Sequence, residues 1–196
     1  MDAAQSNHLK AYGLAYWILK NNTEVDWLLN YRGGSFMCDY SPQIQNELVI
    51  RGISYEVISS AQTNQILTEI SSPALNYDIM KLEKVPRIAV YSPKSKQPWD
   101  DAVTLVLTYA EIPYDIIFDD EVLRNELPKY DWLHLHHEDF TGQYGKFYRT
   151  YGNFPWYIEQ QQEAEGMAKK YGFAKVSQLK LAVVNRIKEF VSGGGF

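Results

Sequence analysis

The stretch "RIAVYSPKSKQPWDDAVTLVLTYAEIPYDIIFD", residues 87–119, decides the expected fold. It opens with an apolar run of strand length at 87–93 and continues through a helical pattern at 97–112. A second branched apolar run follows at 114–119. Strand, helix and strand in this order predict a parallel βαβ unit, because a helical crossover is what joins two parallel strands.

The same alternation recurs over the rest of the chain. Further strands are expected at 24–31, 54–59 and 130–137. Helices are expected at 6–21, 41–52, 60–70, 120–127, 155–172 and 176–194. The pattern predicts an α/β fold with a mostly parallel sheet. We expect a first βα-rich part over residues 1–80 and a second α/β part over residues 84–196, with the latter truncated at its C-terminus.

Composition narrows the classes of function. The 196 residues are 45% hydrophobic, which is enough for a real core, and 14% aromatic. The net charge is −5 with no basic stripe, so the chain lacks the electrostatic signature of a nucleic-acid-binding protein. No apolar run approaches the roughly 18 to 20 residues of a membrane span. Cys38 is the only cysteine, which excludes an internal disulfide.

The histidine-rich segment "YDWLHLHHEDFTGQYGKFY", residues 130–148, carries the most chemical information. On a strand, His134 and His136 would point to the same face. Three interpretations remain for them. In the first, His134 is half-buried and hydrogen-bonded while His136 and His137 line a cleft. In the second, His136 and Glu138 perform acid–base work on a ligand. In the third, the group holds a metal with Glu138 or Asp139 as an oxygen ligand. We assign no metal ligand from the sequence.

Other candidate residues follow the expected strands, where a parallel sheet binds its ligands. We expect them to share one edge of the sheet, and they are Asn30, Arg32, Gly33, Gly34, Ser35, Ser92, Lys94, Lys96, Asp119, Asp120, His136, His137, Glu138 and Asp139. The glycine loop "NYRGGSF", 30–36, either cradles an anion with Arg32 or is a tight turn that needs positive φ. Tyr144 belongs to an aromatic, glycine-rich loop that either binds a ligand or packs onto the sheet. Neither a dinucleotide-binding nor a P-loop spacing is present, so no cofactor is specified.

Four segments together resemble an uncharacterised Bacteroidetes family that carries the automatic label "asparagine synthetase B". They are "SNHLKAYGLAYWILK", "VDWLLNYRGGSF", "KQPWDDAVTLVLTYAEIPYDIIFDDEVL" and "YDWLHLHHEDFTGQYGKFY". The resemblance implies a flavodoxin-like three-layer sandwich, similar to the class I glutamine-amidotransferase-like and trehalose-utilisation (ThuA-like) domains. It also implies an exported, periplasmic protein in which further chain flanks the present residues.

The expected function is that of an amidotransferase-like or hydrolase-like domain with its ligand cleft at the strand carboxyl ends. Asparagine synthesis itself is not expected, since Asp2 stands where such enzymes have a catalytic cysteine, and the S-G-G-x-D-S loop is absent. The alternative is a non-catalytic module that binds a carbohydrate or a cell-envelope partner through the aromatic loop. Either function implies a small polar or carbohydrate ligand, and the sequence does not specify an oligomeric state.

Overall fold

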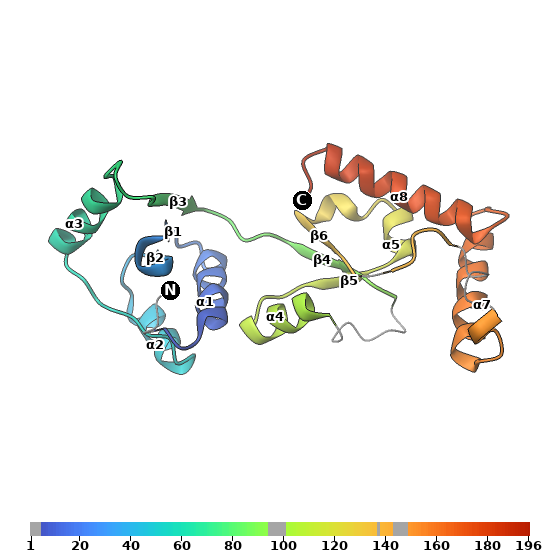
Figure 1. Cartoon of the computed structure of the whole chain (residues 1–196), viewed down its shortest axis with the longest axis horizontal. Coiled ribbons are helices and arrows are strands. Elements are labelled where there is room, and N and C mark those ends of the chain that lie inside the picture. The colour runs from blue at the N-terminus through green and yellow to red at the C-terminus, as the bar shows by residue number, and fades with distance from the viewer. Residues whose placement is uncertain (1–4, 94–100, 137, 143–148) are drawn as a thin grey trace. The chain divides into compact units, whose positions relative to one another are not determined.

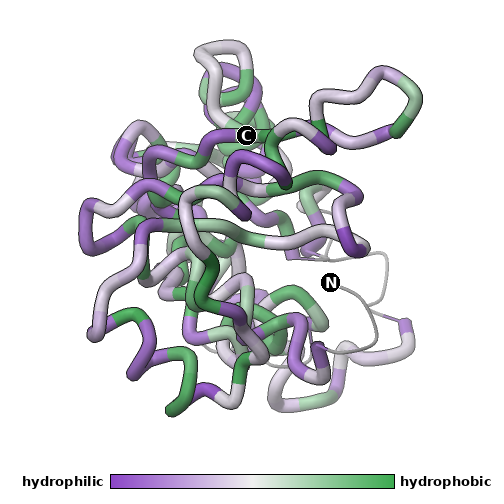
Figure 2. The backbone as a smooth tube through the Cα atoms, turned by 90° about the vertical axis from the view of Figure 1, so that its left-hand side faces the viewer, coloured by the Kyte–Doolittle hydropathy of each residue, from purple (hydrophilic) through white to green (hydrophobic). Residues whose placement is uncertain are grey.

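The computed structural model describes residues 5–93, 101–136, 138–142 and 149–196. The chain divides into two compact units (Figure 1). The first comprises Met1–Val85 with Ala102–Pro113, and the second comprises Pro86–Asp101 with Tyr114–Phe196. The fold class is mixed α/β, as expected. Green and purple stretches intersperse along the backbone in Figure 2, and none of the described helices is long and apolar enough to cross a membrane.

The first unit combines helices with a small antiparallel sheet. Its elements are α1 (His8–Lys20), β1 (Val25–Leu29), η1 (Tyr31–Gly33), β2 (Ser35–Met37), α2 (Pro42–Ile50), α3 (Ser60–Ile70), β3 (Asp78–Leu82) and α4 (Ala102–Ala110). Local signals set the helix starts. The side chains of Asn7, Ser41 and Ser59 cap α1, α2 and α3 by accepting from backbone N–H groups of the first turn.

Pairing in this sheet corrects the expectation of a mostly parallel arrangement. The strand order is β2-β1-β3, and β1 is antiparallel to both neighbours. Residues 54–59 were expected to form a strand and do not, because Tyr55 and Val57 are exposed and present no buried face to a sheet. The strands β2 and β3 were not predicted, because each is short and no residue of either is fully buried.

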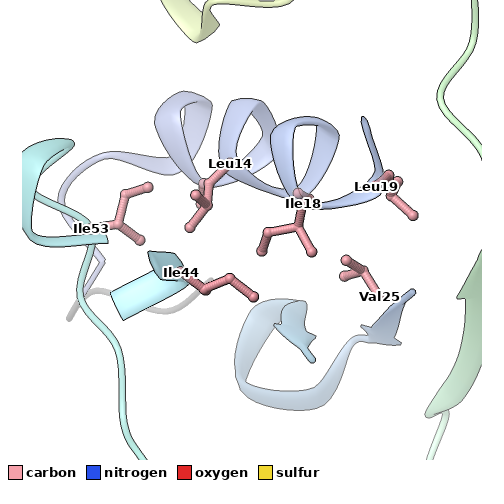
Figure 3. Close-up of a cluster of buried hydrophobic side chains, with 8 residues drawn as sticks. Leu14, Ile18, Leu19, Val25, Ile44 and Ile53 are labelled. Carbon is pink, nitrogen blue, oxygen red and sulfur yellow. The ribbon is translucent and has the colours of Figure 1, made fainter. Parts of the chain in front are cut away.

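The core of the first unit is formed by one side of α1 together with residues of β1 and α2. In Figure 3, Leu14 and Ile18 project from α1 toward Ile44 of α2, and Val25 of β1 lies close to Ile18. Burial of each such aliphatic side chain contributes about 1.5–3 kcal/mol to stability. The opposite side of α1 meets α4, where Gly13 sits so close to the Ala110 carbonyl that a Cβ would overlap it.

The second unit carries the parallel sheet. Its elements are β4 (Ile88–Tyr91), β5 (Asp115–Ile117), α5 (Asp119–Leu123), η3 (Leu127–Lys129), β6 (Trp132–Leu135), α7 (Pro155–Lys170) and α8 (Val176–Ser192). The strand order is β5-β4-β6, and both pairings are parallel. Every residue of the central strand β4 is buried, as is typical of a strand covered on both faces.

Helix α8 covers one face of this sheet (Figure 1). Val183 of α8 shares a buried cluster with Ala89 and Tyr91 of β4 and with Leu133 of β6. Because side chains alternate along a strand, Val90 and His134 lie on the other face, where the register pairs them. His136 falls on that same face, one step beyond the end of β6.

Candidate functional site

The carboxyl edge of the parallel sheet contains a topological switch point. The chain passes from β4 to β5 on one side, whereas β6 lies on the opposite side of β4. Ligands of open α/β sheets bind in the crevice that such a reversal creates beyond the strand ends. Continued by one residue, the register Tyr91↔Leu135 brings Ser92 level with His136 at this position.

His136 and Glu138 meet at the switch point. The His136 Nδ1 atom lies 3.5 Å from Glu138 Oε1, and the residue His136 is only 3% exposed. The Glu138 N–H also donates to the His136 carbonyl at 2.6 Å. The arrangement pairs an imidazole with a carboxylate, and both are side chains that act in general acid–base catalysis.

Ser92 supplies a buried hydroxyl at the end of β4. Its backbone N–H donates to the Ile117 carbonyl at 3.0 Å, so the parallel ladder continues through this residue. Its side chain is fully buried, and within the described residues its Oγ has no hydrogen-bond partner. A buried hydroxyl without a partner is uncommon in proteins and is often associated with a functional site.

A buried polar cluster lies beneath this edge, on the face that α8 covers. Lys180 Nζ donates to Asp119 at 2.8 Å from Oδ2 and to the Tyr91 hydroxyl at 3.0 Å. The Tyr91 hydroxyl also bonds to Asp119, and the ammonium lies 4.3 Å from the centre of the Phe118 ring. Sequence reasoning named Asp119 but missed Tyr91 and Lys180. No local signal could have joined them, since 89 positions separate the two residues.

The loop that carries Glu138 is held by contacts of its own. Phe140 stacks on Tyr91 with ring centroids 5.0 Å apart. Asp139 Oδ1 accepts from the Thr141 N–H at 2.8 Å, which forms a local turn. Gly142 has φ +63°, and a Cβ there would approach Ser177 N to 2.8 Å. Asp139, expected as a ligand contact, therefore caps this turn.

Asp120, another candidate, bonds to Lys170 and Tyr171 at the end of α7 and not to the His136–Glu138 pair. Hydrogen bonds from Lys170 and then from Tyr171 hold the pKa of its carboxyl below the usual value, against the effect of desolvation. The Tyr171 hydroxyl donates to Asp120 Oδ1 at 2.8 Å. This carboxylate stays ionised and ties α5 to the end of α7, so it is a poor candidate for proton transfer.

The glycine loop belongs to the first unit, which corrects the expectation that Arg32 lies at the edge of the parallel sheet. The loop is a tight turn between the antiparallel strands β1 and β2, with positive φ at Asn30, Arg32, Gly33 and Gly34. The N–H groups of Gly33 and Gly34 already donate within the turn, at 3.1 and 2.9 Å.

The side chains of this turn are also engaged. The Ser35 hydroxyl donates to the Tyr31 carbonyl at 3.2 Å. Arg32 forms an exposed ion pair with Glu56 at 3.2 Å. An anion at this turn would therefore compete with contacts that the protein already makes.

The remaining candidates divide as follows. His134 is half-buried and bonds to Asp101, in agreement with a structural role for this histidine. The residues Lys94, Lys96, His137 and Tyr144 lie outside the described part of the chain. Among the residues that the structure describes, no group of three or more histidine, cysteine or acidic side chains is arranged to hold a metal.

Burial and the neighbouring Asp39 raise the pKa of the Cys38 thiol, which disfavours the thiolate.

Two hollows of the second unit lie apart from His136. One, of about 400 Å³, is lined by Gly142, the last described residue of the site loop, and by residues of α7 and the start of α8. The other, of about 420 Å³, is at the amino edge of the sheet beside Arg87 and Asp131. Neither hollow is lined by His136. The carboxyl edge is therefore chosen as the candidate site for its side-chain chemistry and its topology, and not for a cavity.

No family model, no curated protein and no solved structure matches the chain.

Proposed function

We propose that the second unit is a hydrolase-like or amidotransferase-like domain that binds a small polar ligand beyond the carboxyl ends of β4 and β6. One observation carries the proposal. A buried imidazole lies at the topological switch point, and its Nδ1 is 3.5 Å from the Glu138 carboxylate. The crevice at a switch point is where open α/β sheets bind their ligands, and an imidazole with a carboxylate there supports an acid–base role.

The roles of the three groups follow from their positions. His136 accepts a proton from a water molecule or hydroxyl that attacks the ligand, and later returns it to the leaving group. Glu138 faces the Nδ1 side of the ring and stabilises the imidazolium that forms in between. The Ser92 hydroxyl, level with His136 on the neighbouring strand, donates to a polar atom of the ligand.

The finer fold assignment is part of the same proposal. In a flavodoxin-like sheet the first strand lies between the second and the third. The order β5-β4-β6 agrees with that pattern. Phe196 supports it too, because its N–H donates to the Asp131 carbonyl at 3.0 Å and its carbonyl accepts from Leu133 N–H at 2.7 Å, a parallel pairing on the outer edge of β6. Membership of the Bacteroidetes family that the sequence resembles is likewise proposed.

A hydrolysis screen tests the reaction. The full chain is incubated with a panel of small amides and esters, and the rate is compared with that of His136→Asn and Glu138→Gln. We expect turnover that falls on the order of 10²–10⁴-fold in the histidine variant. His8→Asn and Glu189→Gln are matched controls that leave the rate unchanged, since both residues are exposed and lie outside the site. Turnover that survives His136→Asn would exclude the proposed base.

A second function, carbohydrate binding, is favoured by one observation. Tyr151, Phe154 and Trp156 are each more than a third exposed, and the Tyr151 and Trp156 ring centroids lie 5.4 Å apart. Exposed rings of this kind stack against the apolar faces of sugars. A glycan array probed with the intact chain and with Trp156→Ala tests it, and binding that Trp156→Ala leaves unchanged would refute the idea.

A further inference from the structure

We propose that Lys180 and Phe140 are positioning residues for Glu138, and that they act through the ring of Tyr91. This inference rests on the proposed function, because it assigns to the buried cluster the task of holding Glu138 against His136. The contacts that carry it all lie within the second unit.

The first step is the anchoring of Tyr91 from below. Lys180 contacts the Tyr91 hydroxyl at 3.0 Å and both carboxylate oxygens of Asp119, at 3.0 and 2.8 Å. All three residues are at most 2% exposed. Because the ammonium and the carboxylate fix the hydroxyl from two sides, the ring of Tyr91 is held in a single orientation.

The second step is the contact between the Tyr91 ring and the loop that carries Glu138. Phe140 stacks on Tyr91 with an interplanar angle of 23°, while Phe118 packs against the same ring at 4.9 Å. Phe140 is two residues from Glu138, so the stack sets where the carboxylate can lie. Asp139 stiffens the intervening backbone through its bonds to the Thr141 N–H and hydroxyl.

The third step is a direct contact between the same loop and helix α8. Gly142, two residues after Phe140, lies against Val176 and Ser177 at the start of this helix. Lys180 projects from the same helix one turn later. Helix α8 therefore contacts this segment directly at Gly142 and, through Lys180 and Tyr91, at Phe140.

NMR of the His136 ring at a fixed pH tests the inference without any ligand or turnover. The Glu138 carboxylate lies 3.5 Å from His136 Nδ1, so Glu138→Gln is expected to shift the resonance of this nitrogen. Phe140→Leu is expected to shift it in the same direction by at least half as much, and the double variant no more than Glu138→Gln alone. The neighbouring pair His134–Asp101 lies on the same face and is left intact in every variant.

Phe173→Leu is the matched control, because Phe173 packs in a separate cluster against α7 and α8. It leaves the resonance of His136 Nδ1 unchanged if the effect belongs to the loop. Lys180→Met shifts this resonance in the same direction as Phe140→Leu. A wild-type His136 ring spectrum in Phe140→Leu, or no change in Glu138→Gln, overturns the inference. The absence of turnover in the hydrolysis screen, by contrast, overturns only the proposed function.

Discussion

Replacement of Gly13 by alanine is a sharp test of the packing in the first unit. Gly13 faces α4 from the middle of α1, and a Cβ at this position would overlap the carbonyl oxygen of Ala110. The obstacle is backbone, which cannot rotate away as the end of a flexible side chain can. Gly13→Ala must therefore separate the two helices or distort one of them.

The expected magnitude combines two opposing effects. Overpacking in a well-packed interface costs typically about 1–3 kcal/mol, and direct overlap with backbone places this case at the upper end. Alanine gains about 1 kcal/mol over glycine in helix propensity. The net loss of stability is then about 2 kcal/mol, which corresponds to an increase of about 30-fold in the opening equilibrium of the α1–α4 contact.

Hydrogen exchange followed by mass spectrometry measures this opening locally, which matters in a chain of two units. Amides of α1 and α4 are expected to exchange about 30-fold faster in Gly13→Ala, while those of α8 keep their rates. Gly166→Ala in α7 is the matched control, because nothing lies within 4 Å of a Cβ there. It should slow exchange in α7. Equal or slower exchange of α1 in Gly13→Ala would refute the packing described here.

Two further predictions concern charged groups. The hydrogen bond from Lys10 holds the pKa of Glu111 below the usual value of a glutamate. This carboxylate therefore stabilises the fold at neutral pH, and its contribution is lost as the pH falls through the lowered pKa. Glu111→Gln should be less stable at pH 7, and its stability should depend less on pH in acid denaturation; a pH dependence equal to wild type would contradict this. Lys180→Met leaves the buried Asp119 carboxylate without its cation, so it should lower the free energy of unfolding in urea by about 3–5 kcal/mol. The double variant Lys180→Met with Asp119→Leu should regain part of this stability. A double variant as unstable as Lys180→Met would show that the lost ion pair is not the cause.

The sequence allowed the helices to be predicted well and the strands of the first unit poorly. Helix starts depend on local chemistry, such as the caps at Asn7 and Ser41, which a sequence displays directly. Strand pairing depends on distant partners. Residues 54–59 have strand-forming composition, but Tyr55 and Val57 are exposed and the segment is not a strand. In contrast, β3 pairs with β1 in a register that its own residues do not reveal.

The same distinction applies to the site. His136 and Glu138 were predicted together because they are two positions apart in the sequence and follow an expected strand. The cluster around Lys180 was not predicted, because a lysine on an amphipathic helix usually faces solvent and only the tertiary packing brings it to Asp119 and Tyr91. Arg32 was placed at the wrong sheet, since a glycine turn after an apolar run looks alike in parallel and antiparallel pairing.

Chemical-shift mapping on the ¹⁵N-labelled chain tests the proposed ligand site most directly. The probes are a library of small polar amides, esters and sugars. We expect the perturbed backbone amides to gather at Ser92, Phe118, His136 and Glu138, at the carboxyl edge of the parallel sheet. Shift changes confined to Arg87 and Asp131 at the amino edge, with no change at the carboxyl edge, would contradict the proposal.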